Sequence, residues 1–217
     1  MNLKISATSK MMALSVAFLM SLLLVRFYYS HSVYYGFYVW NSFLAIVPYV
    51  ISTRLLKQKK PGGFSIALIV LWLVFLPNAP YLVTDLFHYE ERSSAPYWYD
   101  LFIVVTAAWN GLLLGMISLM NVEQFLSRHL KPIWVTTSVF CSLLLCSYGI
   151  FIGRFLRFNS WDIVTEPGTL AYTSAHHVLL PQQYPKLWVF TILFSVLLTI
   201  VYFTLKKLPR HGSMQAA

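Results

Sequence analysis

Six long apolar stretches, separated by short polar segments, account for most of the chain. They cover residues 11–25, 33–51, 64–83, 97–120, 132–152 and 187–205. A helix that crosses the hydrocarbon core of a bilayer needs about 20 apolar residues, within a range of about 17–25. The pattern therefore predicts an all-α fold, a polytopic membrane bundle of about six transmembrane helices. The short first stretch is expected to borrow residues on either side.

Composition favours a single integral membrane domain over residues 1–217. Hydrophobic residues make up 58% of the chain and charged residues only 11%, whereas a soluble domain carries about 25% charged residues. Lipid must therefore cover much of the surface, and membrane lipid is the first expected partner. Lys4 and Lys10 precede the first stretch as in a signal peptide. Bulky residues 26–29 follow it without a small-residue cleavage site, so a retained helix is expected.

The Lys and Arg residues predict the orientation of the bundle. Eleven of the 16 fall on one side of the predicted membrane and five on the other, so both termini are expected in the cytoplasm. The net charge of +9 does not indicate nucleic acid, because the basic residues lie in short loops that set orientation and meet anionic lipid. Most acidic residues lie on the other, extracytoplasmic side or at its boundary: Asp85, Glu90, Glu91, Asp100, Asp162 and Glu166.

The third stretch is interrupted near its outer end by Pro77, Asn78 and Pro80. Residues 64–76 span only about 20 Å as a helix, whereas the hydrocarbon core is about 30 Å thick. Both prolines are therefore expected inside the membrane. Because proline removes a backbone donor and frees the carbonyl four residues earlier, the three residues are predicted to form a structural kink.

A polar stripe follows this kink. Asn78, Tyr81, Asp85 and His88 are spaced so that a helix would place them on one narrow face. Asp85 and His88 are therefore candidate catalytic residues. In the alternative interpretation, the Pro-Asn-Pro segment ends a helix and the side chains of Asp85 and His88 are merely solvated.

The fourth stretch contributes Asp100, which follows three aromatic residues at the expected membrane boundary. A carboxylate at this depth should face the interior of the bundle and find a partner, which makes Asp100 another catalytic candidate. Deeper in the stretch, Gly111 and Gly115 form a G-x-x-x-G motif. The motif predicts a helix–helix contact and would allow a dimer without requiring one.

The fifth stretch delivers Arg154 and Arg157 to the same outer surface, one helical turn apart, followed by Asn159 and Asp162. Two arginines on one face suit the capture of phosphate or carboxylate, so Arg154, Arg157 and Asn159 are candidate anion-binding residues. The arginines equally suit a structural clasp with the nearby aspartates, of which Asp162 is also a catalytic candidate. The long segment 153–186 is expected to cap the outer end of the bundle.

No metal site and no cofactor are predicted. Asp85 and His88 lie one turn apart and residues 176–177 are histidines, but zinc takes three or four convergent ligands. Walker A, dinucleotide-binding and nucleophile-elbow motifs do not occur. Cys141 and Cys146 lie inside an apolar stretch and are expected to be free packing residues.

Three segments together resemble a known family. They are the Leu-Pro-Asn-Ala-Pro-Tyr segment with the Asp-Leu that follows it, over 76–86, the Trp-Tyr-Asp at 98–100, and the Gly-Arg-Phe-Leu-Arg-Phe-Asn-Ser-Trp-Asp at 153–162. The chain resembles the DUF1361 family, a group of uncharacterised bacterial multi-pass membrane proteins. The resemblance implies a polytopic protein of the bacterial cytoplasmic (inner) membrane, and it transfers no catalytic role.

The sequence leaves three classes of function open. A membrane-embedded enzyme or binding protein would use the extracytoplasmic polar cluster to hold an anionic small molecule or a lipid-linked substrate. In an accessory or structural subunit, the same cluster would be a salt-bridge clasp. A small transporter would place polar groups near the bilayer midplane on broken helices from repeated halves. The broken third stretch fits that class, but the chain shows no repeat.

Overall fold

The computed structural model describes residues 7–89 and 96–208, apart from the side chain of His88. The predictions for Lys4, Glu90, Glu91 and the side chain of His88 concern residues that lie outside the described part of the chain. The helices are α1 (Ala7–Ser30), α2 (Phe37–Leu56), α3 (Gly63–Phe75), α4 (Asn78–Tyr81), α5 (Tyr97–Leu126), α6 (Pro132–Phe155), α7 (Asp162–Thr165), α8 (Pro167–Leu179) and α9 (Pro185–Lys207). Three short 3₁₀ helices are η1 (Tyr34–Gly36), η2 (Leu82–His88) and η3 (Pro181–Gln183).

Six helical segments in the described part of the chain are long and apolar enough to cross a membrane. They are Ala7–Ser30, Tyr34–Leu56, Gly63–Phe87, Tyr97–Leu126, Pro132–Phe155 and Pro185–Lys207. The prediction of an all-α bundle with about six membrane helices is confirmed. The first helix does extend beyond its apolar stretch at both ends. The chain is therefore a multi-pass membrane protein.

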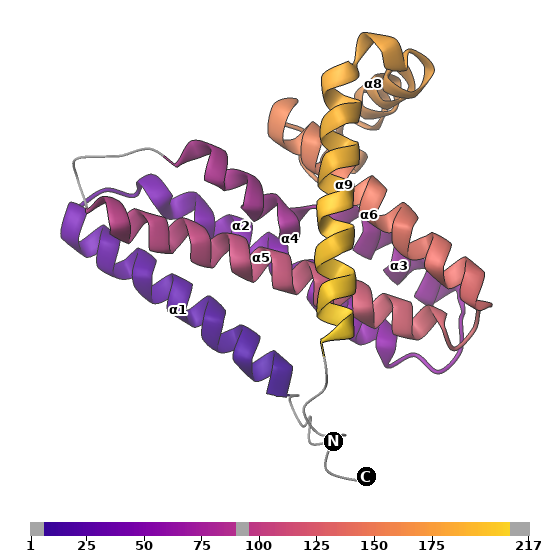
Figure 1. Cartoon of the computed structure of the whole chain (residues 1–217), viewed down its shortest axis with the longest axis horizontal. Helices are drawn as coiled ribbons and strands as arrows, with labels where there is room; N and C mark the ends of the chain where they lie inside the picture. The colour runs from indigo at the N-terminus through magenta and orange to yellow at the C-terminus, as the bar shows by residue number, and fades with distance from the viewer. Residues whose placement is uncertain (1–6, 90–95, 209–217) are drawn as a thin grey trace.

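Helix α5 is the longest and lies at the centre of the bundle. Helices α1, α2 and α4 and the 3₁₀ helix η2 all pack against it, whereas α6 packs mainly against α9. Figure 1 shows α9 crossing α5 at a steep angle. One apolar cluster joins α3, α5, α6 and α9 around residues such as Trp72 and Leu143. A second joins α1, α2 and α5 around Leu19 and Ile103.

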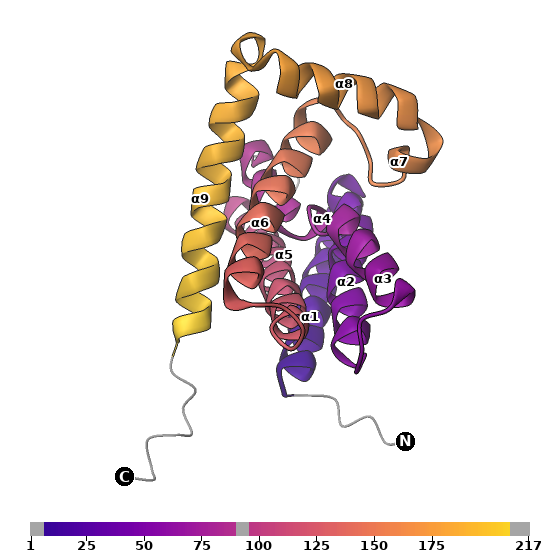
Figure 2. The ribbon, with the colours of Figure 1, turned by 90° about the vertical axis from the view of Figure 1, so that its right-hand side faces the viewer.

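One end of the bundle carries the polar residues of interest, and we call it the α8 end. The chain leaves α1 and α6 and enters α2, α5 and α9 at this end. Figure 2 shows α8 running from the start of α9 past the end of α6 to α7. Most of the segment 153–186 is thus helical, in α7, α8 and η3.

Buried His177 fixes α8 to the two helices beside it. Its Nδ1 is hydrogen-bonded to Tyr148 Oη of α6 at 2.9 Å, and its carbonyl oxygen accepts from Trp188 Nε1 of α9 at 3.1 Å. Burial, with a smaller effect of adjacent His176, lowers the pKa of His177 below its ordinary value of 6.5. The docked side chain is therefore neutral at physiological pH.

The third membrane segment is broken where the prolines predict a kink. Helix α3 ends at Phe75, and α4 begins at Asn78 after two turn residues. Asn78 Nδ2 donates to the Phe75 carbonyl at 3.0 Å, so the side chain satisfies a backbone acceptor exposed by the break. Pro80 has no N–H to donate to the Leu76 carbonyl four residues earlier. This carbonyl accepts a hydrogen bond from Ala79 N instead, at 3.2 Å.

Glycines on α5 and α6 make room for this broken segment. A Cβ atom at Gly111 would lie 2.2 Å from the Ala79 carbonyl oxygen, and one at Gly149 would lie 2.6 Å from Pro77 Cγ. A Cβ at Gly115 would be 3.2 Å from the Pro80 ring. The helix that covers the G-x-x-x-G motif is therefore α4 of the same chain, and a second copy is not needed to bury it.

Candidate binding site at the α8 end

Two buried ion pairs stand at the α8 end, and the first joins α1 to α5. Arg26 Nε donates to Asp100 Oδ1 at 2.7 Å, and Nη2 donates to Oδ2 at 3.1 Å. Both side chains are only 2% exposed. The guanidinium also lies over the ring of Tyr35, 4.6 Å from its centroid. Asp100 faces the interior as its depth requires, and its carboxylate is committed to this bidentate pair.

The second ion pair joins α6 to η2. Arg154 Nη1 donates to Asp85 Oδ1 at 2.9 Å and to Tyr81 Oη at 3.1 Å. Nη2 donates to the Thr84 carbonyl at 2.7 Å. The Asp85 side chain is 3% exposed, and its Oδ2 is buried without a hydrogen-bond partner among the described residues. Arg154 therefore links α6 to three acceptors on the third membrane segment, and its side chain is 9% exposed.

The polar stripe keeps part of its predicted geometry. Beyond Tyr81 the chain tightens from an α-helix into η2, which has about three residues per turn instead of 3.6. Tyr81 and Asp85 still face the same arginine. Asn78 faces Ser160 instead, with Nδ2 donating to Ser160 Oγ at 2.8 Å.

The prediction that Arg154 and Arg157 share a helical face is wrong. Helix α6 ends at Phe155, and Arg157 has a φ of 62° in the left-handed region, which residues other than glycine rarely adopt. Its side chain is exposed and has no ion-pair partner within residues 7–89 and 96–208. The left-handed turn sends the chain back toward the bundle, where Phe158 N donates to the Ile152 carbonyl at 3.3 Å.

Asp162 has a local role in the chain that returns from this turn. Its Oδ2 accepts from the backbone N–H of Asn159 at 2.6 Å, and its Oδ1 accepts from Thr165 Oγ1 at 3.2 Å. These bonds hold the turn that begins α7. Asp162 therefore pairs with neither predicted arginine, and its carboxylate oxygens are occupied within its own turn.

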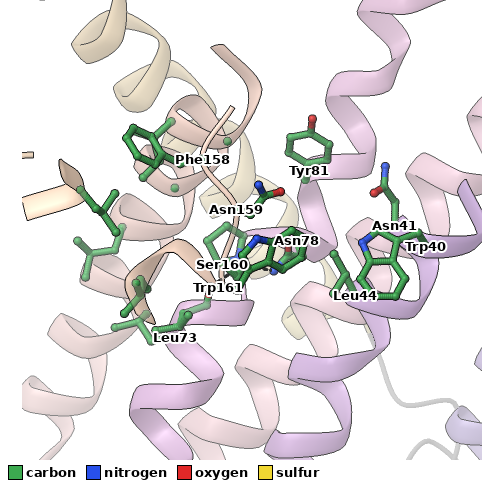
Figure 3. A pocket seen from close by; sticks show the side chains of 18 residues that line it. Trp40, Asn41, Leu44, Leu73, Asn78, Tyr81, Phe158, Asn159, Ser160 and Trp161 are labelled. Carbon is green, nitrogen blue, oxygen red and sulfur yellow. Dashed lines mark hydrogen bonds between the residues drawn. The ribbon is translucent and has the colours of Figure 1, made fainter. Parts of the chain in front are cut away.

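A cavity of about 250 Å³ lies between α2, α3, α4, α6 and residues 158–163. Its polar lining consists of Asn41, Asn78, Tyr81, Asn159 and Ser160. Figure 3 shows Asn78, Ser160 and Trp161 grouped in the middle of the view, with Trp40 and Asn41 on one side of them. We call this cavity the amide pocket, after its three asparagine side chains.

Aromatic and apolar side chains complete the amide pocket. Trp40 of α2 and Trp161 meet edge to face, with ring centroids 6.4 Å apart, and both line the cavity. Ile163 of α7 and Leu170 of α8 also line it, and Figure 2 shows these two helices at the α8 end of the bundle. Wide aromatic faces beside amides are the usual composition of a pocket that orients a small molecule.

The lining groups, as far as the structure describes them, are all uncharged. Asparagine amides each offer donors and an acceptor, and hydroxyls offer both. The amides of Asn41 and Asn159 have no hydrogen-bond partner among the described residues. The candidate carboxylates of Asp85, Asp100 and Asp162 do not line the pocket. The described residues also contain no cluster of three or more His, Cys, Asp or Glu that would hold a metal ion.

Several residues of this end were not identified from the sequence as parts of a site. Arg26 follows the first apolar stretch directly and bonds Asp100. A charged residue at this depth needs a partner, and this was the signal by which the sequence could have identified it. Ser160 lies within the segment that carries the family resemblance. Trp40 and Asn41 join the pocket only because α2 stands beside α3 and residue 161 folds back onto it.

The helices and the pocket define a class: a polytopic α-helical membrane protein with an uncharged polar cavity at one end. Residues 40–201 match the family described as "Protein of unknown function (DUF1361)". The match spans more than half of the chain, and the protein belongs to this family. No curated protein and no solved structure matches the chain.

Proposed function

We propose that this protein is a membrane binding protein whose amide pocket holds an uncharged, hydroxyl-bearing molecular group. The observation that carries the proposal is the cavity lined by Asn41, Asn78, Asn159, Ser160 and Tyr81 beside two tryptophans. Hydroxyl groups both donate and accept hydrogen bonds, as the amides do. The flat faces of Trp40 and Trp161 suit the C–H surface of a ring such as a sugar.

The arrangement of the charges supports binding over acid–base catalysis. Asp85 and Asp100 are each buried and paired with an arginine, and neither carboxylate lines the pocket. Arg154 acts on the pocket indirectly. It donates to the oxygen of Tyr81 at 3.1 Å, which leaves the hydroxyl hydrogen of Tyr81 to be donated to a ligand.

We place the pocket on the extracytoplasmic side of a bacterial inner membrane. The excess of Lys and Arg in the loops of the opposite end supports this orientation. Fusions of a cytoplasm-active reporter after residue 60 and after residue 170 test it. The first fusion should be active and the second inactive, and the reverse pattern would remove the proposed orientation.

Three octyl amphiphiles with different headgroups test the binding proposal. Protein in lipid nanodiscs is melted in the presence of octyl β-glucoside, octyl phosphate or octyltrimethylammonium, each below its micelle-forming concentration. A ligand that binds the folded state raises the melting temperature. Only the glucoside should give a saturable rise. A rise with the phosphate alone would instead support the anionic substrate predicted from the two arginines.

A matched pair of amide variants locates the binding. Asn41 lines the pocket, and Gln183 of η3 is exposed outside the pocket lining. Asn41→Ala should weaken the glucoside about tenfold, the effect of losing one hydrogen bond worth about 1.4 kcal/mol. Gln183→Ala should leave it unchanged. Equal affinities in the two variants would contradict the assignment of the amide pocket.

A second candidate is an accessory subunit in which the polar cluster is purely structural. The two buried ion pairs, Arg26–Asp100 and Arg154–Asp85, favour it. In that case Asp85→Asn would prevent the protein from accumulating. Pocket variants such as Asn41→Ala would then be without effect on any bound amphiphile or on the phenotype of the cell.

A further inference from the structure

The amide pocket extends beyond its polar residues, away from the α8 end, between α3 and α6. Leu73 and Val74 of α3 line it on one side, and Leu145 and Ile152 of α6 line it on the other. We call these four residues the lipid-facing slot. The pocket therefore has a polar part at the α8 end and an apolar part further along the same two helices.

The slot lies inside the hydrocarbon layer. Leu145 precedes the last residue of α6 by ten positions, which is about 15 Å of helix, or about half the thickness of a hydrocarbon core. Leu145 lines the pocket and is 49% exposed. On the other wall, Val70 lies one turn before Val74 and is 57% exposed. The pocket thus reaches the lipid-covered surface.

The aqueous side of the pocket is bordered by aromatic side chains and by helices, although Trp40 and Trp161 are themselves 52% and 41% exposed. The edge-to-face contact of Trp40 with Trp161 joins α2 to the returning chain, at 6.4 Å between centroids. Ile163 of α7 and Leu170 of α8 also line the pocket. His177 in turn holds α8 against α6 and α9. The two ends of the pocket therefore differ in chemistry: amides, a hydroxyl and tryptophans border the aqueous side, and only apolar side chains border the slot.

We infer that the ligand is an amphiphile that enters from the bilayer, with its hydroxyl-bearing headgroup in the amide pocket and its alkyl chain in the lipid-facing slot. The inference rests on the proposed function, and it adds that the ligand has an alkyl chain and that the ligand enters the pocket from the bilayer. A soluble sugar or polyol offers the same headgroup chemistry without a chain, so the two sources are distinguished by probes that differ only in the chain.

The test uses octyl β-glucoside and methyl β-glucoside, with binding measured from the melting temperature of the protein in nanodiscs. Octyl β-glucoside should bind at least about tenfold more tightly than the methyl compound, because its chain keeps it in the layer onto which the slot opens. Equal affinities would mean that the ligand reaches the pocket from water, which would overturn the inference while leaving the headgroup proposal intact.

Two neighbouring leucines on α6 give a matched pair of variants. Leu145 lines the slot, whereas Leu144 is similarly exposed, at 42%, outside the pocket lining. Leu145→Trp should fill the slot and weaken octyl β-glucoside about tenfold, without changing the affinity for methyl β-glucoside. Leu144→Trp should change neither affinity.

Each result separates the two proposals. If Leu145→Trp binds the octyl probe as well as the wild-type protein does, the slot holds no chain and the inference is wrong. If it weakens both probes equally, the substitution distorts the pocket, and lateral access is again contradicted. If neither glucoside binds the wild-type protein, the proposed function itself fails, and the inference fails with it.

Discussion

The close fit between α4 and α5 leaves no room for a side chain at Gly111. A Cβ there would lie 2.2 Å from the Ala79 carbonyl oxygen and 2.9 Å from two atoms of Leu82. Backbone cannot rotate away as a side chain can, so Gly111→Ala must push α4 off α5. Overpacking costs about 1–3 kcal/mol, and a backbone clash belongs at the upper end of that range.

One effect acts in the opposite direction. Alanine is a better helix former than glycine by up to about 1 kcal/mol, so the net loss for Gly111→Ala is about 2 kcal/mol. For a chain of this size, about 1 kcal/mol shifts the melting temperature by roughly 2–4 °C. The melting temperature in detergent, followed by far-ultraviolet circular dichroism, should therefore fall by about 4–8 °C.

Other glycines of the chain supply a graded control series. Gly149→Ala meets Pro77 Cγ at 2.6 Å and should also destabilise, whereas Gly115→Ala, at 3.2 Å from Pro80, should cost less. Gly168 of α8 has nothing within 4 Å of its Cβ position, so Gly168→Ala should be neutral or slightly stabilising. If Gly111→Ala melts at the same temperature as Gly168→Ala, the insertion of α4 between α5 and α6 is refuted.

Two further predictions concern charge. Asp100→Asn leaves the buried Arg26 cation without its counter-ion and should cost about 3–5 kcal/mol in thermal unfolding. The docking of α8 should weaken with acid. The pKa of docked His177 lies below 6.5, so lower pH protonates the undocked form first. The stability of docking is complete above about pH 6.5 and is lost as the pH falls below it. Limited proteolysis of α8 between pH 8 and pH 5 measures this loss.

Each of these predictions has a control. Combining Asp100→Asn with Arg26→Met removes both charges and should recover much of the stability. An equal loss in the single and double variants would show that packing, and not the unpaired cation, sets the cost. His176→Ala keeps the buried imidazole of His177 and should retain the acid sensitivity. His177→Phe should remove it, and persistence of the pH effect there would exclude this histidine as its source.

The sequence alone determined the class of the protein, its six membrane-spanning segments and the break in the third of them. Apolar runs and the thickness of a bilayer are local and one-dimensional constraints, so six spans could be predicted, together with an interruption at Pro77 and Pro80. Depth also required that Asp100 find a partner, and the spacing of Gly111 and Gly115 required a closely packed neighbour. In both cases the sequence indicated that a contact must exist but did not indicate which residue or helix makes it.

The tertiary structure decided which residues make these contacts. Asp100 pairs with Arg26 across 74 positions of the chain, and Asn78 meets Ser160 across 82. Such contacts depend on which helices are neighbours and on single backbone turns, such as the left-handed conformation of Arg157. The spacing of residues along the chain does not encode these contacts. Lipid solvates every apolar helix face almost equally, so only the packing of side chains decides which helices become neighbours.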